Sequence, residues 1–191
     1  MHITVLSAKI PRTLPKKTEE KMRRCMPEVR LARLDSQSAP LRAQALCAYA
    51  LLKHSVGGEL PEIFYTASGK PYFKDRPEMF FSLSHTDGAV LCAVADAGVG
   101  ADIERLREVS MTAVRRMGAE NSADFIERWV RRESRAKYLG ESAFAAPMRF
   151  LDNERDGKYY RLALLPCFVS GVFCGGEADI RTETVNINNL F

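Results

Sequence analysis

The possible folds of this chain are limited first by residues 79–106, MFFSLSHTDGAVLCAVADAGVGADIERL. Apolar and polar residues alternate through parts of this stretch, and Thr86-Asp87-Gly88 and Asp96-Ala97-Gly98 interrupt it. A period of two is typical of strands, and residues of these types form the turns between them. We therefore predict two or three strands close together in the middle of the chain.

Two segments outside this stretch have the pattern of helices. Residues 40–58, PLRAQALCAYALLKHSVGG, carry apolar residues at helical spacing and end in a glycine pair. Residues 122–140 begin with Ser122 as the expected N-cap and end at Gly140. A basic amphipathic segment, residues 18–34, precedes both helices and is interrupted at Pro27.

The remaining segments predict further strands. Residues 2–7 alternate as a first strand does, and residues 62–73 read as a strand that runs into a Ser-Gly-Lys-Pro turn. After Pro147 we expect antiparallel strands within 158–174, joined by an Asp156-Gly157 turn and the segment around Pro166. This order predicts an α+β fold in two halves, residues 1–97 and 98–191.

Composition excludes several classes of protein. The 191 residues are 46% hydrophobic, which is enough for a core, and the net charge is only +4. The apolar stretches are too short to span a bilayer about 30 Å thick, and the start lacks the pattern of a signal peptide, so we expect a cytoplasmic protein. Five cysteines without C-x-x-C spacing argue against zinc and a disulfide framework.

A pair of carboxylates, Asp102 and Glu104, is the first candidate site. Residues i and i+2 of a strand project to the same face, and hard oxygen ligands suit Mg²⁺. The pair taken alone fits better the polar face of an ordinary strand whose Ile103 points into the core, because such alternation is the commonest strand pattern.

Other candidates have similarly ordinary alternatives. Glu133 and Lys137 share a helix face among several arginines, which could face phosphates or form a solvated surface with a supporting ion pair. Four further residues could contact an anion but are also typical of turns, strand ends and helix surfaces. They are Arg42, Lys70, Ser84 and His85.

In its order of features, the chain resembles the 4′-phosphopantetheinyl transferase superfamily. Gly100 to Glu104 match the motif G-[ILVA]-D-x-E, and Trp129 to Lys137 match W-x-x-K-E-[SA]-x-x-K, with Arg132 in place of the usual lysine. A Gly-Lys-Pro turn at 69–71 and a Ser-His pair at 84–85 precede them. The length fits the surfactin-synthetase-activating (Sfp-type) class rather than the half-length class that trimerises.

The resemblance implies two pseudo-symmetric halves, each a small antiparallel sheet packed with a long helix. It implies Mg²⁺ binding by Asp102, Glu104 and Glu133 against the pyrophosphate of coenzyme A. It implies catalytic roles for Glu133 and Lys137, although either Glu133 or a metal-held water could take the proton. The cofactor-binding residues that it implies are Arg42, Lys70, Ser84, His85, Arg132 and Lys137.

The resemblance also implies the reaction. The expected activity moves 4′-phosphopantetheine from coenzyme A to a serine of an acidic acyl or peptidyl carrier protein and releases 3′,5′-ADP. A monomer is expected, and so is the absence of a membrane partner. We expect no nucleic-acid partner, because the basic helix lacks interleaved aromatic residues. The alternative is a non-catalytic member of the fold that binds coenzyme A or a nucleotide.

Overall fold

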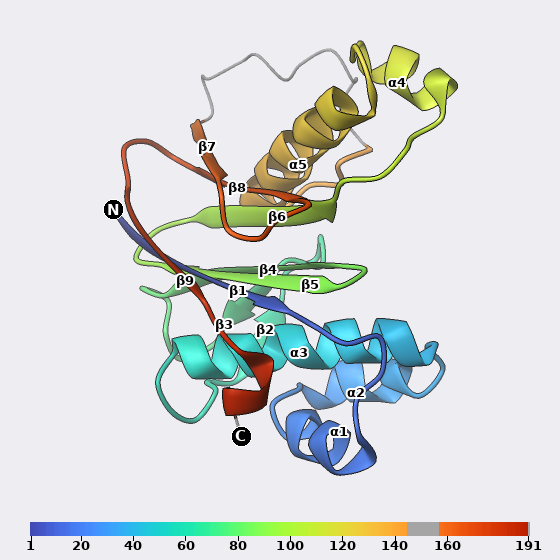
Figure 1. Cartoon of the computed structure of the whole chain (residues 1–191). Coiled ribbons are helices and arrows are strands. Elements are labelled where there is room, and N and C mark those ends of the chain that lie inside the picture. The colour runs from blue at the N-terminus through green and yellow to red at the C-terminus, as the bar shows by residue number, and fades with distance from the viewer. Residues whose placement is uncertain (145–156, 191) are drawn as a thin grey trace.

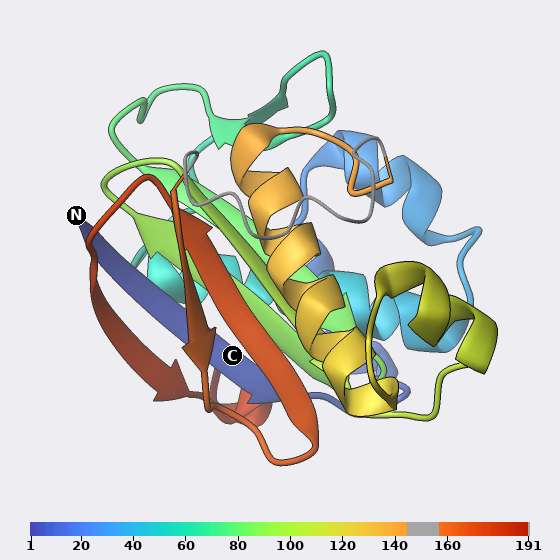
Figure 2. The same ribbon diagram turned by 90° about the horizontal axis from the view of Figure 1, so that it is seen from above.

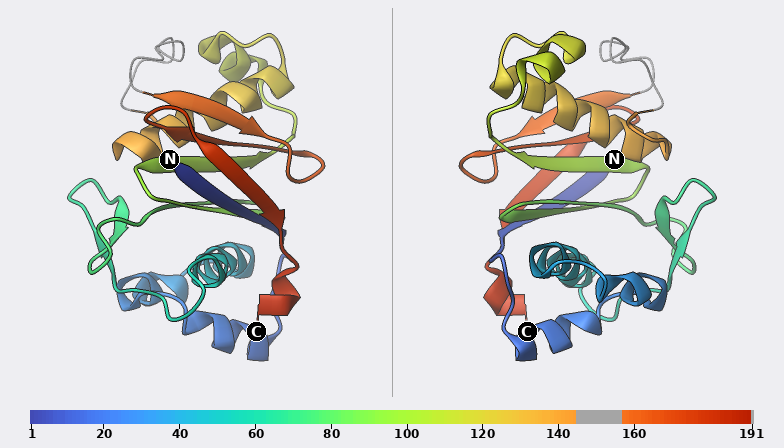
Figure 3. Two further views of the ribbon diagram at one scale, coloured as in Figure 1. Left: turned by 90° about the vertical axis from the view of Figure 1, so that its left-hand side faces the viewer. Right: turned by 90° about the vertical axis from the view of Figure 1, so that its right-hand side faces the viewer.

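Four layers, in the order helix, sheet, sheet and helix, build the protein in this computed structural model (Figures 1 and 3). The structure describes residues 1–144 and 157–190, so the predicted turn residue Asp156 lies outside the described residues. Within those ranges, no helix is long and apolar enough to cross a membrane.

The sheet nearer the N-terminus has the order β4-β5-β1-β9. It consists of β1 (His2–Lys9), β4 (Phe80–Thr86), β5 (Ala89–Ala95) and β9 (Asp179–Thr184). Strand β5 is antiparallel to β4 and β1, whereas β9 is parallel to β1. The predicted antiparallel sheet is therefore mixed, because a strand from within residues 98–191 crosses over to complete it.

A second sheet lies on the first and has the order β6-β8-β7. Its antiparallel strands are β6 (Val99–Arg105), β7 (Lys158–Leu162) and β8 (Phe168–Cys174). A short hairpin, β2 (Ile63–Tyr65) and β3 (Pro71–Phe73), stands beside the sheets. The predicted strands of residues 62–73, 79–106 and 158–174 are thus confirmed, but β9 was not predicted.

Both predicted helices are present, one on each outer face. Helix α3 (Ala39–Ser55) covers the first sheet, and α5 (Ser122–Leu139) crosses the second (Figure 2). The basic N-terminal segment forms α1 (Lys16–Arg23) and α2 (Glu28–Leu34), separated at Pro27 as expected. Among the described residues, the remaining helices are α4 (Met111–Met117) and a 3₁₀ turn (Ile187–Leu190).

The ends of α5 explain where the helix begins and ends. The predicted cap, Ser122, is wrong by one residue, because the Asn121 side chain accepts the backbone N–H of Asp124. The Ser122 hydroxyl instead accepts the N–H of Val109. Gly140 ends the helix in the left-handed conformation, with φ of 72°, as predicted.

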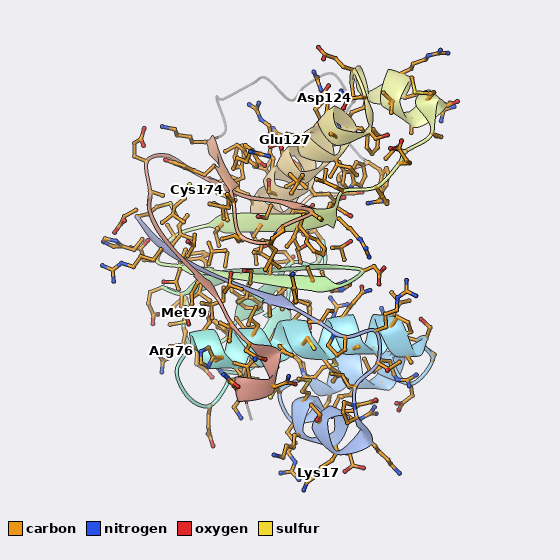
Figure 4. The ribbon with its side chains drawn as sticks, viewed as in Figure 1. Lys17, Arg76, Met79, Asp124, Glu127 and Cys174 are labelled. Carbon is orange, nitrogen blue, oxygen red and sulfur yellow. The ribbon has the colours of Figure 1, made fainter. Side chains whose placement is uncertain are left out.

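Apolar side chains fill the space between the layers (Figure 4). In β5, Leu91 and Ala93 point toward the second sheet, whereas Val90 and Cys92 point toward α3. Burial on both faces explains why this strand is apolar at nearly every position. In β4, Phe81 contributes to the core beneath the first sheet, and the intervening hydroxyl residues reach β6.

Candidate functional site

Strand β6 carries the two predicted carboxylates opposite α5. Ala101 and Ile103 belong to the core between the sheets, and the alternate residues Gly100, Asp102 and Glu104 occupy the other face. A Cβ atom at Gly100 would overlap the backbone of α5 at Ser134 and Tyr138. The glycine of the motif is therefore needed because helix and strand are in direct backbone contact.

Asp102 is buried, with 3% of the residue exposed. Oδ1 accepts hydrogen bonds from Ser84 Oγ at 2.6 Å and from Lys137 Nζ at 2.7 Å. Oδ2 is buried without a hydrogen-bond partner among the described residues. A buried, unpaired carboxylate oxygen is costly in a protein and is suited to a cation.

Glu133 lies close enough to Asp102 and Glu104 for the charges of both to act on it. Burial raises the pKa of Glu133, and the charges of Asp102 and Glu104 raise it further, whereas Lys137 lowers it. Glu104 Oε2 accepts hydrogen bonds from Thr86 and Arg107. Among the described residues, no group of three or more Asp, Glu, His or Cys side chains is placed to hold a metal ion as the structure stands.

This arrangement fits a magnesium ion in the chemistry of its donors. Carboxylates that repel one another stay apart without a cation, and Lys137 partly neutralises the Asp102 charge. Asp102 Oδ2, which has no partner among the described residues, is then an oxygen that a metal could use, and Glu104 and Glu133 would supply further carboxylates. Mg²⁺ commonly uses one or two carboxylates and completes its shell with water and phosphate oxygens.

A pocket of about 450 Å³ opens beside the carboxylates and has several cationic side chains in its lining. It is built from α2, the turn between β2 and β3, β4 and the end of α5. His85 lines both this pocket and a neighbouring hollow that contains Glu104, so the two regions are adjacent. The cationic lining residues are Arg30, Arg33, Lys70 and Lys137.

Lys70 and His85, two of the residues expected to contact an anion, line this pocket. Lys70 Nζ donates to the carbonyl oxygen of Tyr138 at 2.6 Å, and burial lowers the pKa of this lysine. His85 Nδ1 lies 3.0 Å from Gln44 Oε1 on α3. Burial lowers the pKa of His85 and the charge of Lys137 lowers it further, against the opposing effect of Asp102.

Three of the predicted cofactor-binding residues do not line the pocket. Arg42 Nη1 donates to the carbonyl oxygen of Gln37, and its Nε lies 3.4 Å from Glu19. Arg132 is buried and donates to the carbonyl oxygen of Ala143. The Ser84 hydroxyl is directed at Asp102.

Other pocket residues were missed in the sequence. Arg30 and Arg33 occupy the wall from α2, one turn apart. Arg30 Nε donates to Tyr65 Oη at 3.2 Å, and its guanidinium lies 4.9 Å from the centre of that ring. The sequence feature that could have indicated them is the basic amphipathic pattern of residues 18–34, but this pattern does not predict which arginines face the pocket.

Fold and site together define an α+β protein whose cationic pocket adjoins clustered carboxylates, an arrangement suited to a phosphorylated ligand and a divalent metal ion. The chain is similar to 4′-phosphopantetheinyl transferase AcpT of Escherichia coli (strain K12), with 32% identity over 128 residues, 59% of this chain and 65% of the relative. AcpT of Salmonella typhi is 34% identical over 119 residues, covering 54% and 62% of the two chains.

A third relative extends the same similarity. The 4′-phosphopantetheinyl transferase gsp of Aneurinibacillus migulanus is 29% identical over 89 residues, 40% of this chain and 37% of the relative. No family model matches the chain. The matches span less than two thirds of each of these relatives, and all three support the family resemblance that the motifs indicate.

Proposed function

We propose that this protein is a 4′-phosphopantetheinyl transferase of the Sfp-type class. Its substrates are coenzyme A and an acidic acyl or peptidyl carrier protein, and its metal ion is Mg²⁺. The similarity to named transferases supports the reaction, and the two motifs support the assignment of the site residues. We also propose that the fold consists of two halves, residues 1–97 and 98–191.

The observation that carries the proposal is the half-satisfied carboxylate of Asp102 at the edge of a cationic pocket. One oxygen is held by Ser84 and Lys137, and the other is buried without a partner among the described residues. Glu133 faces the same region from α5. A metal-bound pyrophosphate needs this combination of free carboxylate oxygen, neighbouring acids and adjacent cations.

In the proposed reaction, the carrier serine oxygen attacks the phosphorus that bears the pantetheine arm. The new O–P bond forms as the pyrophosphate bridge breaks, and 3′,5′-ADP leaves. Bound Mg²⁺ would supply charge stabilisation on the pyrophosphate oxygens, held by Asp102, Glu104 and Glu133. Lys137 lies where its ammonium can share that charge.

The residues around the metal site divide the remaining work. Glu133 has a raised pKa and is positioned on α5 to accept the proton of the serine hydroxyl, directly or through water. Lys70, His85, Arg30 and Arg33 bind the phosphates of the nucleotide portion from the pocket wall. Arg42 and Arg132 would act indirectly, because neither lines the pocket.

Incubation with apo acyl and apo peptidyl carriers, coenzyme A and Mg²⁺ tests the proposal. Intact mass spectrometry should show one added 4′-phosphopantetheine on the carrier serine, and Glu133→Gln should abolish it. Glu127→Gln is the matched control, because Glu127 lies on the same helix (Figure 4) but pairs with Arg161. Tight binding of coenzyme A without transfer to any carrier would instead favour the non-catalytic alternative.

A further inference from the structure

Three hydroxyl side chains on β4 reach across to β6. Ser82, Ser84 and Thr86 occupy alternate positions and therefore share one face of the strand. The first hydrogen bond is from the backbone N–H of Ala101 to Ser82 Oγ, at 2.9 Å. The hydroxyls of Ser84 and Thr86 donate to Asp102 and Glu104, the carboxylates of the proposed metal site. The same row of side chains therefore contacts both backbone and carboxylates.

The direction of the Ser84 hydroxyl is fixed by a second contact. The backbone N–H of Ile103 donates to Ser84 Oγ at 3.3 Å, so this oxygen acts as an acceptor there. Its own proton is directed to Asp102 Oδ1, 2.6 Å away. Ser84 is buried and does not line the pocket, so its hydroxyl is committed to Asp102 rather than to a phosphate.

Thr86 stands in the same relation to Glu104. Its hydroxyl donates to Glu104 Oε2 at 3.1 Å, and Arg107 donates to the same oxygen at 3.0 Å. The pattern repeats that of Asp102, where a β4 hydroxyl and a cationic side chain converge on a single oxygen. In Asp102 the second oxygen, Oδ2, has no hydrogen-bond partner among the described residues.

We propose that Ser84 and Thr86 are positioning residues that orient Asp102 and Glu104 toward the metal ion. This inference rests on the proposed function, because it takes the metal to be the Mg²⁺ of that site. Hydrogen bonds to a ligating carboxylate fix its rotamer, and losing such a partner typically weakens metal binding by about 10- to 100-fold. The Ser-x-Ser-x-Thr spacing on β4 thus matches the Asp-x-Glu spacing on β6.

The inference is tested by Mn²⁺ titration of the full-length protein, with and without coenzyme A, following free Mn²⁺ by electron paramagnetic resonance. Thr86→Val keeps the shape but removes the hydroxyl, and Thr86→Ser restores it. We expect Thr86→Val and Ser84→Ala to weaken Mn²⁺ binding by about 10- to 100-fold, and Thr86→Ser to bind within about threefold of wild type.

Ser82→Ala is the matched control, because it removes a hydroxyl of the same row that accepts the backbone N–H of Ala101 and has no carboxylate partner among the described residues. It should lower stability to urea but leave Mn²⁺ affinity unchanged. The inference is overturned if Thr86→Val and Ser84→Ala bind Mn²⁺ like wild type, or if Ser82→Ala weakens binding as much. If the variants bind Mn²⁺ as expected but the protein modifies no carrier, the proposed function is refuted and the inference about Ser84 and Thr86 stands.

Discussion

Asp102 combines burial with incomplete hydrogen bonding, and both properties affect stability. Its side chain is 5% exposed, whereas that of Lys137 is 29% exposed. The pair therefore lies at the boundary between the interior and the pocket, where an ion pair is only weakly screened by solvent. Removal of Lys137 would leave the buried Asp102 charge without its counter-ion, whereas a bound cation would satisfy Asp102 Oδ2.

Replacement of Lys137 by methionine should destabilise the protein by about 2–4 kcal/mol, because the buried Asp102 charge loses its counter-ion. This loss is smaller than the largest losses seen when a fully buried ion pair is broken, because the Lys137 side chain is partly exposed. Urea unfolding at pH 7 measures the loss. Lys137→Arg preserves the charge and should recover most of it, and equal stability of wild type and Lys137→Met would refute the role given to this pair.

Glu133→Gln should raise the melting temperature of the metal-free protein at pH 7. The pKa of Glu133 is raised, so the folded state favours the protonated form and pays a cost when the group ionises. That cost appears as pH rises from the ordinary glutamate value of about 4.3 through the raised pKa, so the benefit of glutamine should vanish at lower pH. Scanning calorimetry at pH 4 and 7 checks this, and a lower melting temperature at pH 7 would contradict it.

His85 should make stability fall as pH decreases below about 6.5. Its pKa is lowered in the folded state by burial and by Lys137, so the unfolded chain binds the proton more readily. The neutral form is stabilised above that pH, and the advantage is lost as pH falls toward the folded pKa. Urea unfolding at pH 5.5 and 7.5 should show a smaller difference for His85→Gln than for wild type, and identical differences would count against this assignment.

At the scale of elements, the site depends on the contact between α5 and β6. Helix and strand meet backbone to backbone at Gly100, and Glu133 and Lys137 are carried past the β6 carboxylates on the same helix. The serines of β4 bind β6 from the other direction. The proposed metal site therefore lies where three elements with separate sequence signals converge.

Gly100→Ala should lower the free energy of unfolding by about 1–3 kcal/mol or more. The added methyl group would overlap backbone atoms of Ser134 and Tyr138, which cannot rotate away, so α5 must shift from β6. The variant should also bind Mn²⁺ more weakly. Gly58→Ala is the control, since its Cβ would meet nothing within 4 Å, and equal losses in both variants would exclude a specific packing effect.

The elements that sequence predicted well are those with a strong local period or stop signal. Residues 40–58 and 122–140 are helical because apolar spacing and terminal glycines act together. Residues 79–106 form three strands, as their apolar runs and the turn residues between them predicted. Strand β9, DIRTET, was missed because five of its six residues are exposed, so burial leaves no apolar pattern to detect.

The site was predictable where residues are close in sequence or belong to a spaced motif. Asp102, Glu104, Glu133 and Lys137 come together because strand and helix periods determine their faces. Sequence could not predict the contribution of α2, because the inward direction of Arg30 and Arg33 depends on how that helix packs against α3 and the hairpin. Nor does local sequence show that Arg42 turns toward Glu19.

At the scale of the whole molecule, the pocket joins parts of the chain that lie far apart in sequence. Arg30, Lys70 and His85 come from the first hundred residues, whereas Lys137 and Glu141 come from α5 and the residues after it. The Lys70 bond to Tyr138 links the β2–β3 turn directly to the end of α5. A ligand in this pocket would therefore contact both parts at once.

Coenzyme A with Mg²⁺ should stabilise the protein by about 2.7 kcal/mol at a hundredfold excess over its Kd. Hydrogen exchange should slow both in the β2–β3 turn and at the end of α5, because the ligand contacts both sides of the pocket. Differential scanning fluorimetry with added EDTA measures the metal-dependent part. Protection confined to one side of the pocket would contradict a bridging ligand.

The pairing of β9 with β1 has a consequence for folding during synthesis. His2 lies opposite Asp179 in the parallel ladder, so β1 leaves the ribosome long before its partner strand, which is 177 residues further along the chain. Until residues 179–184 emerge, the outer edge of β1 can pair with other extended chains. Contacts of such long sequence separation slow folding, so the emerging chain depends on rapid formation of the β1–β5 pair to limit aggregation.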